Sequence, residues 1–255
     1  MTWTTRQRSE IAGHPAIVAG QGPVVLLLHG VGLRAEAWGS QIDALAGAGF
    51  RAIAPDMIGH GAAAPSGASS LEDFVAPVRA MVDGPAVVVG HSMGAMMALA
   101  LGSEVQGVVA MNAVYRRSDA AKAAVTARAA SLDGQTVADP EPTLARWFGT
   151  APSEARHACE QWLRDADLAG YRAAYTVFAA EDGPEDAALA GLRCPALFLT
   201  GAEEPNSTPE MSQAMAALAP QGRCVVVEGA AHMLPMTHAA VVNAVLVEFA
   251  ERCLR

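Results

Sequence analysis

Short runs of apolar residues recur along the chain, separated by polar or glycine-containing turns. Apolar runs of this length are typical of parallel strands that are covered on both faces of a sheet. The runs are Val24–Leu28, Ala52–Ala54, Ala86–Val89, Val108–Met111, Ala196–Leu199 and Val225–Val227. Helix-length segments lie between several of them, at Ala35–Ala48, Leu71–Val82 and Met93–Leu101. This alternation predicts an α/β fold with a mostly parallel, doubly wound sheet.

Two further segments extend this core at the ends of the chain. Thr4–Glu10 and Pro15–Val18 flank Gly13, which predicts an antiparallel hairpin at one edge of the sheet. Near the other end, Ala239–Cys253 repeats apolar residues at helical spacing, which predicts a helix that packs with one face on the core. Those apolar residues are Val241, Val242, Val245, Leu246 and Phe249.

The alternation of strands and helices stops between residues 114 and 188. This stretch contains no strand-like run and is rich in Ala and Arg, which favours several helices. Because the strand series resumes at Ala196, we interpret the stretch as an insertion into the core and not as a separate domain. The predicted organisation is a core made of residues 1–113 and 189–255 and a helical cap made of residues 114–188.

The charge of the chain narrows the classes of partner. Its 26 acidic and 17 basic residues give a net charge of −9, with a pI near 5.2. A field of this sign repels nucleic-acid phosphates and anionic membrane surfaces. We therefore expect a small-molecule substrate, and neither a nucleic acid nor a membrane as partner. A local pocket can oppose the global charge, so small substrates remain compatible with this composition.

Signals for a metal site, a membrane span or an export segment are lacking. The four cysteines form no C-x-x-C pair and no Cys/His cluster with zinc spacing, so we expect no metal and no organic cofactor. No apolar run approaches the ~18 residues that span a bilayer, and the polar start of the chain resembles no signal peptide. We expect a cytoplasmic protein, and a homo-oligomer is compatible with the sequence.

Residues Gly90 to Gly94 carry the first chemical signal, a G-x-S-x-G motif centred on Ser92. A predicted strand, Ala86–Val89, runs straight into the motif and a predicted helix runs straight out of it. A turn this tight strains the serine backbone and presents the hydroxyl above the sheet, and small residues on both sides let it close. A serine that only caps the helix would need no glycine on either side. Ser92 is therefore the candidate nucleophile.

A second glycine-rich turn, His29-Gly30-Val31-Gly32, follows the predicted strand Val24–Leu28. A bend of this kind can aim a backbone N–H at the carbonyl oxygen of a bound acyl group. We predict that the amides of Val31 and Met93 together form an oxyanion hole. An ordinary strand-to-helix glycine turn is the alternative.

A serine nucleophile needs a base, and seven histidines compete for that role. His232 lies in the loop after the run Val225–Val227, at the carboxyl end of the last predicted strand, where sites assemble in open α/β sheets. The others lie in the hairpin, the two turns, a further loop, the cap or the start of the last helix, and are His14, His29, His91, His60, His157 and His238. We predict that His232 is the base.

An acid should orient that base and stabilise its charged form. Glu204 follows the next-to-last predicted strand and is the leading candidate, with its neighbour Glu203 as the rival. Asp56 precedes Ser92 in the chain, and we expect it to order its own loop. The resulting order of nucleophile, acid and base is Ser92, Glu204 and His232, which is the chain order of an α/β-hydrolase triad.

Taken together, these motifs resemble the α/β-hydrolase family over nearly the whole chain. They are His29-Gly30, Asp56, Gly59-His60-Gly61, the motif around Ser92, and His232. The second half of the chain is similar to 3-oxoadipate enol-lactonases and related carboxylesterases. The matching stretches are Arg146-Trp147-Phe148, Gly170–Ala174 and Cys194–Gly201. This sequence departs from those lactonases at Ala95, where glycine is usual, and the family usually has aspartate at the position of Glu204.

The resemblance implies the α/β-hydrolase fold and a serine hydrolase that cleaves a carboxylic ester or lactone through an acyl-enzyme. We expect Trp147, Phe148 and Tyr171 of the cap to line the acyl pocket; the alternative is that they pack within the cap. The same scaffold suits a C–C bond hydrolase of ring-cleavage products or a cofactor-free perhydrolase. A non-catalytic ligand-binding member is the alternative from another class. Epoxide hydrolases and dehalogenases of this fold use a carboxylate nucleophile, so Ser92 argues against them.

Overall fold

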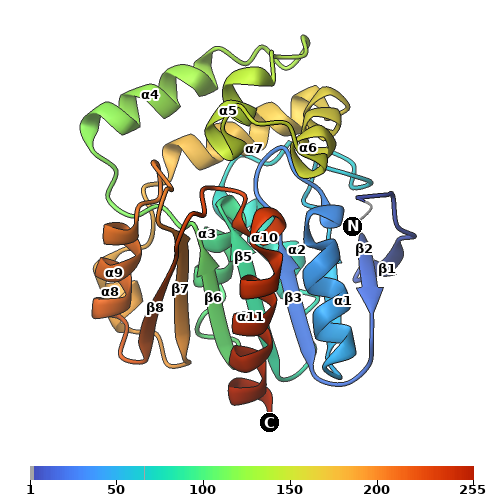
Figure 1. Ribbon diagram of the computed structural model, residues 1–255, viewed down its shortest axis with the longest axis vertical. Coiled ribbons are helices and arrows are strands. Elements are labelled where there is room, and N and C mark those ends of the chain that lie inside the picture. The colour runs from blue at the N-terminus through green and yellow to red at the C-terminus, as the bar shows by residue number, and fades with distance from the viewer. Residues whose placement is uncertain (1–2, 66) are drawn as a thin grey trace.

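In the described part of the chain, residues 3–65 and 67–255, the computed structural model shows one eight-stranded sheet with helices on both faces (Figure 1). The strands are β1 (Ser9–Ile11), β2 (His14–Ala19), β3 (Val24–Leu28), β4 (Arg51–Pro55), β5 (Ala86–His91), β6 (Gly107–Met111), β7 (Ala196–Gly201) and β8 (Gly222–Val227). Their order across the sheet is β1-β2-β4-β3-β5-β6-β7-β8. The pairings among β3 to β8 are parallel, and β1 and β2 form an antiparallel edge. The predicted fold class is confirmed.

Successive side chains of the central strands enter opposite halves of the core. In β3, Leu26 and Leu28 join one apolar cluster, whereas Val25 and Leu27 join the other, because side chains alternate along a strand. The core helices are η1 (Ala35–Trp38), α1 (Gly39–Gly47), α2 (Leu71–Arg79), α3 (Met93–Ala100), α8 (Asp186–Ala190), α9 (Pro209–Leu218), α10 (Leu234–Thr237) and α11 (Ala239–Leu254). Helices α1 and α11 cover one face of the sheet, and α2, α3 and α9 cover the other. Both faces of the sheet are therefore shielded from solvent, which explains why the central strands are continuous apolar runs.

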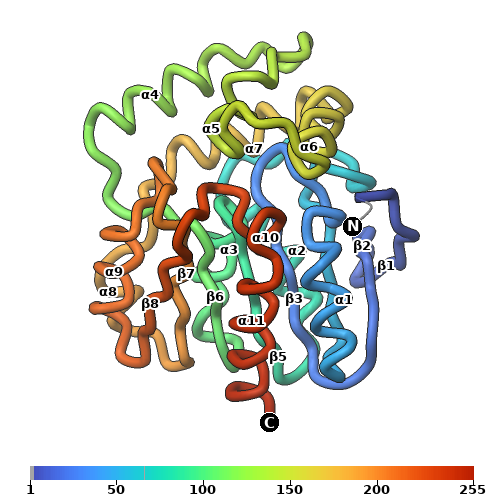
Figure 2. Tube along the Cα trace, in the orientation of Figure 1, coloured from blue at the N-terminus to red at the C-terminus, as the bar shows by residue number. Residues whose placement is uncertain are grey.

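Four helices lie over the carboxyl ends of the strands, at the top of Figure 1. They are α4 (Asp119–Ala130), α5 (Glu141–Phe148), α6 (Glu154–Arg164) and α7 (Leu168–Ala180). Figure 2 shows the chain rising from β6 into α4 and returning through α7 towards β7. Side-chain caps mark where three of these helices begin: Ser118, Ser153 and Asp167 each accept a backbone N–H of the first turn. We call these four helices and their connections the cap.

The cap packs against two loops of the core through one apolar cluster. From the cap it contains Leu144, Trp147, Ala155, Ala158, Cys159, Trp162 and Leu163, and from the core Leu33, Ala37, Met233 and Met236. Leu33 directly follows the glycine-rich turn after β3, and Met233 directly follows His232. The same packing that holds the cap in place therefore also supports the two loops that carry candidate site residues. Among the described residues, no helix has both the length and the apolar character needed to cross a bilayer.

Candidate active site

Ser92 occupies a strained turn between β5 and α3. Its backbone angles are φ 57° and ψ −120°, a positive-φ conformation that costs a non-glycine residue about 1–3 kcal/mol. The flanking glycines are required sterically, because a Cβ at Gly90 would collide with the carbonyl oxygen of Gly94, and a Cβ at Gly94 with that of Leu28. The Ser92 amide donates to the Met111 carbonyl at 2.9 Å, which ties the turn to β6. Ser92 remains half-buried between two buried neighbours.

The glycine-rich turn after β3 lies directly against Ser92. A Cβ added at Gly30 would stand 2.9 Å from the Ser92 Cβ, so only glycine allows this approach. His29 holds the turn: its Nε2 accepts from the Met57 amide at 2.9 Å, and its Nδ1 lies 2.8 Å from the Gly30 carbonyl oxygen. Since Nε2 is an acceptor, Nδ1 carries the proton and donates. Burial lowers the pKa of His29, which keeps this donor neutral.

Two backbone amides next to Ser92 are free to bind a developing oxyanion. Met93 is the first residue of α3, so its amide has no acceptor within the helix. In the described residues, the Val31 amide donates to no other backbone group. Val31 thus lies in the turn that contacts Ser92 through Gly30, and Met93 directly follows Ser92, so both predicted oxyanion donors belong to segments at this residue.

His232 and Glu204 form a buried pair. His232 Nδ1 lies 2.6 Å from one carboxylate oxygen of Glu204, and the other oxygen accepts from the amides of Asn206 at 2.8 Å and Ser207 at 3.3 Å. Burial of Glu204 opposes its ionisation, but the facing histidine and these hydrogen bonds outweigh it and lower its pKa to about 2. Glu204 is 3% exposed, whereas Glu203 points to solvent. Of the two rival carboxylates, the structure therefore places Glu204 against the histidine.

The backbone carbonyl of His232 accepts hydrogen bonds from two side chains. His91 Nε2 donates to it at 2.8 Å and Asn112 Nδ2 at 2.7 Å. Burial, together with the nearby His232, lowers the pKa of His91 to about 3, so this donor stays neutral and does not oppose a charge on His232. His91 immediately precedes Ser92 and Asn112 directly follows β6, so these two hydrogen bonds join the loop of His232 to the turn of Ser92 and to the end of β6.

The sequence pattern gives neither His91 nor Asn112 this role. The one available signal in the sequence is an asparagine directly after a predicted strand; in the structure Asn112 has φ 50°, a conformation that asparagine tolerates better than most residues. That conformation is not visible in the sequence, because asparagine is common in turns of every kind.

The three predicted cap residues take different places. The Trp147 ring stacks on His232, with ring centroids 5.8 Å apart and an interplanar angle of 20°. Trp147 also belongs to the buried cap cluster, against which Phe148 packs. Tyr171 lies over the glycine-rich turn, where a Cβ at Gly32 would stand 2.9 Å from its Cε2. Trp147 and Tyr171 therefore pack within the cap and also contact the candidate site, Trp147 at His232 and Tyr171 at Gly32.

Asp56 orders its own loop, as expected. Its carboxylate accepts the Ala35 amide at 2.8 Å and the Ala62 amide at 2.9 Å. Arg8 donates to the same carboxylate at 2.7 Å and also pairs with the buried Glu36. Hydrogen bonding to Arg8 and the two amides lowers the pKa of Asp56 despite its burial, so the carboxylate remains charged. These contacts join the N-terminal segment to the loops after β3 and β4.

Residues 25–245 match the model of the alpha/beta hydrolase family. The match covers most of the chain, and the fold and the strand–turn–helix around Ser92 have the arrangement expected of that family. The protein therefore belongs to the α/β-hydrolase family and is a hydrolase, which confirms the resemblance found in the sequence.

The chain is also similar to several individual hydrolases. The chain is 37% identical over 235 residues to the (E)-2-((N-methylformamido)methylene)succinate hydrolase of Acinetobacter baylyi, which covers 88% of this chain and 89% of that protein. Among solved structures, an esterase from Thermogutta terrifontis superimposes with a TM-score of 0.86 at 26% identity, covering 98% of this chain and 100% of the other. The enol-lactonase from Burkholderia xenovorans LB400 superimposes with a TM-score of 0.81 at 22% identity, covering 96% and 99%. The last likeness shows the fold alone.

Proposed function

We propose that the protein is a serine hydrolase that cleaves a carboxylic ester or lactone through an acyl-enzyme. The observation that carries this proposal is the strained Ser92 turn, whose neighbour His91 donates to the His232 carbonyl at 2.8 Å, together with a buried pair in which His232 Nδ1 and a Glu204 oxygen are 2.6 Å apart. The hydrogen bond to Glu204 holds the proton on His232 Nδ1, so Nε2 is the acceptor for the serine proton.

In this mechanism Ser92 Oγ attacks the acyl carbon while His232 takes its proton. The carbonyl oxygen becomes negative and binds the amides of Val31 and Met93. His232 then donates its proton to the departing alkoxide, which leaves Ser92 acylated. His232 then deprotonates a water molecule, which attacks the acyl carbon, and returns that proton to the Ser92 oxygen as the carboxylic acid is released. The ionised Glu204 stabilises the imidazolium in both steps.

Hydrolysis of an N-acyl bond is the second candidate. It is favoured by the relative that is 37% identical over 89% of its length, because the compound in the name of that hydrolase contains an N-methylformamido group. The same residues would act in the same order, and His232 would protonate a nitrogen in place of an oxygen. The products distinguish this candidate from ester hydrolysis, C–C bond cleavage and perhydrolysis.

The test is a panel of short-chain esters, lactones and N-formyl compounds, with product analysis. We expect turnover of esters or lactones that falls by about 10⁶ in Ser92→Ala, close to the loss on removing a triad serine. Ser131→Ala removes an exposed hydroxyl of the cap and should leave the rate unchanged. A fluorophosphonate probe should label the native protein at Ser92. Retained turnover in Ser92→Ala would overturn the mechanism, and an inert, unlabelled protein would favour a ligand-binding role.

A further inference from the structure

Arg8, in the segment before β1, uses every N–H group of its guanidinium. Nη1 and Nη2 donate to the two carboxylate oxygens of Glu36, each at 2.7 Å. Nε and Nη2 donate to the two oxygens of Asp56 at 2.7 and 3.2 Å, and Nη1 also donates to the Arg6 carbonyl at 2.9 Å. A guanidinium has five N–H donors, so these hydrogen bonds leave none unused. Lysine, whose donors all lie on one nitrogen, cannot reproduce this arrangement.

Arg8 is the counter-charge of two buried carboxylates. The side chains of Glu36 and Asp56 are 2% and 0% exposed. In the described part of the chain, no other basic side chain lies within ion-pair distance of either carboxylate. Burial opposes their ionisation, but hydrogen bonds from Arg8 and from backbone amides outweigh it and lower both pKa values. Without Arg8, two like charges would share one buried region, which is unfavourable.

The two ends of the glycine-rich turn after β3 are held by consecutive residues of the loop after β4. At the first end, the amide of Met57 donates to His29 Nε2 at 2.9 Å. At the second end, Asp56 Oδ1 accepts the amide of Ala35 at 2.8 Å, and the same oxygen accepts from the guanidinium. Val31, whose amide is a predicted oxyanion donor, lies between these two attachments. A shift of the Asp56 carboxylate would therefore displace the segment that carries this amide.

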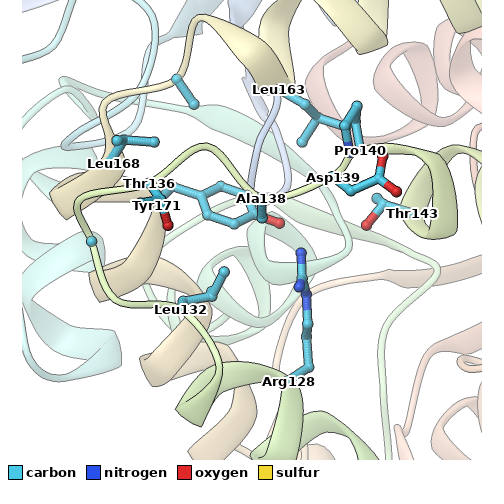
Figure 3. A pocket seen from close by; sticks show the side chains of 12 residues that line it. Arg128, Leu132, Thr136, Ala138, Asp139, Pro140, Thr143, Leu163, Leu168 and Tyr171 are labelled. Atoms are coloured by element: carbon cyan, nitrogen blue, oxygen red, sulfur yellow. The ribbon is translucent and has the colours of Figure 1, made fainter.

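The cap contacts the same turn through less directional contacts. A Cβ at Gly32 would stand 2.6 Å from Leu163 Cδ2 and 2.9 Å from Tyr171 Cε2, and both side chains also line a small cavity inside the cap (Figure 3). Apolar packing is non-directional, so it covers the turn but does not fix the direction of an amide. The hydrogen bonds that do so come from the loop after β4, and one of them depends on the carboxylate that Arg8 holds.

We propose that Arg8 is a positioning residue for the reaction: by holding Asp56 and Glu36, it keeps the glycine-rich turn in the conformation in which the Val31 amide binds the oxyanion. Because the oxyanion forms only during the reaction, loss of this positioning should lower kcat and not raise KM. The charge of Arg8 acts in the same direction, since an uncompensated carboxylate beside the turn would oppose a developing negative charge. This inference rests on the proposed serine hydrolase function.

Hydrogen exchange tests the position of the turn without any turnover. Deuterium uptake into peptides covering residues 29–38 is followed by mass spectrometry in the native protein, in Arg8→Gln and in Arg6→Gln. Arg6→Gln is the matched control, because Arg6 also donates to both oxygens of an aspartate, at 2.7 and 2.8 Å, but that aspartate is the exposed Asp43 of α1. We expect faster uptake in these peptides in Arg8→Gln only, with uptake in β6 unchanged. Equal uptake in all three proteins, or faster uptake over the whole of Arg8→Gln, would refute the positioning role.

The kinetic measurements use ethyl butyrate, followed by pH-stat, and the rate of fluorophosphonate labelling. Arg8→Gln should lower kcat by about 10- to 100-fold, because a misplacement of about 1 Å can cost about 10²-fold in rate, while KM should change less than about threefold. Labelling of Ser92 should slow by a similar factor, and Arg6→Gln should keep both native rates. A raised KM with an unchanged kcat, or an equal loss in Arg6→Gln, would contradict the inference.

Two further variants keep the inference testable if Arg8→Gln does not fold. Arg8→Lys retains the charge and loses the planar fork, and Arg8→Gln combined with Glu36→Gln removes one positive and one negative charge together. We expect both to fold and to have a kcat between those of the native enzyme and of Arg8→Gln, with faster uptake in residues 29–38. Native kcat and native uptake in both variants would overturn the positioning role. If the native protein hydrolyses no ester and takes no fluorophosphonate label, the hydrolase function fails, and the exchange result still decides whether Arg8 holds the turn.

Discussion

Replacing Glu204 with glutamine keeps the size of the side chain and removes its charge. In the native site, one oxygen accepts from His232 at 2.6 Å and the other accepts from the amides of Asn206 and Ser207 at 2.8 and 3.3 Å. Glutamine has one oxygen acceptor to offer to these three donors. Two of the donors are backbone amides that cannot change their proton. The favoured orientation therefore turns the oxygen to the amides and the NH₂ group to His232.

That orientation selects the wrong tautomer of the base. With an NH₂ group donating to Nδ1, the proton of His232 moves to Nε2, which can then no longer accept a proton from Ser92. Loss of a triad acid in this way lowers kcat by ~10⁴, or about 5 kcal/mol of transition-state stabilisation. We expect Glu204→Gln to lower kcat by that factor, with KM changed only a few-fold, because the substrate contacts remain. The kcat of Glu204→Asp should lie between those of the native enzyme and of Glu204→Gln, because removing one methylene opens a gap of about 1.5 Å.

The assay is the initial rate of ester hydrolysis, with Glu203→Gln as the matched control. That variant loses an equal charge at the adjacent, exposed position and should stay within threefold of the native rate. Circular dichroism confirms that each variant folds. A Glu204→Gln enzyme within tenfold of the native rate, or a Glu203→Gln enzyme that is the damaged one, would refute the assignment of the acid.

The same residue makes stability depend on pH. Its pKa is lowered from 4.5 in the unfolded chain to about 2 in the fold, so the folded state binds fewer protons than the unfolded state in this window. The ionised carboxylate therefore stabilises the fold above pH 4.5, and this contribution is lost as the pH falls towards 2. The melting temperature of the native protein should fall more steeply over this range than that of Glu204→Gln. Parallel curves would contradict the assigned ionisation.

Two further variants test the surroundings of His232. Trp147→Ala should lower the melting temperature, because truncating a buried aromatic residue costs about 3–5 kcal/mol, and it should lower the turnover of all esters. Trp147→Phe keeps a ring over His232 and should retain most of the stability and most of the turnover. An effect of Trp147→Ala on large acyl groups alone would instead indicate that the residue lines the acyl pocket. Asn112→Gly keeps the positive φ of this position but removes the donor to the His232 carbonyl, so kcat should fall about tenfold, the upper range for one neutral hydrogen bond, with KM unchanged. An unchanged kcat in Asn112→Gly would show that His91 alone holds the loop.

Local patterns in the sequence were sufficient for the fold and for the conformation of the turn that carries the candidate Ser92. Continuous apolar runs predicted the buried parallel strands, because the covering helices remove the need for polar alternation. The tight turn at Ser92 was predictable because Gly90 and Gly94 are required by contacts within a few residues and with the neighbouring strand. The order of Ser92, Glu204 and His232 follows from the chain order of strand ends, which is a property of the sequence.

Tertiary structure decided what depends on contacts between distant segments. Glu203 and Glu204 are equivalent in the sequence, and only the path of the loop after β7 turns one to solvent and the other to His232. The stacking of Trp147 on His232 joins residues 85 positions apart, and the hydrogen bond from Asn112 to the His232 carbonyl joins residues 120 apart. Side-chain direction in a loop has no fixed period, unlike that in a helix or strand, so such pairings follow only once the sheet and cap have packed.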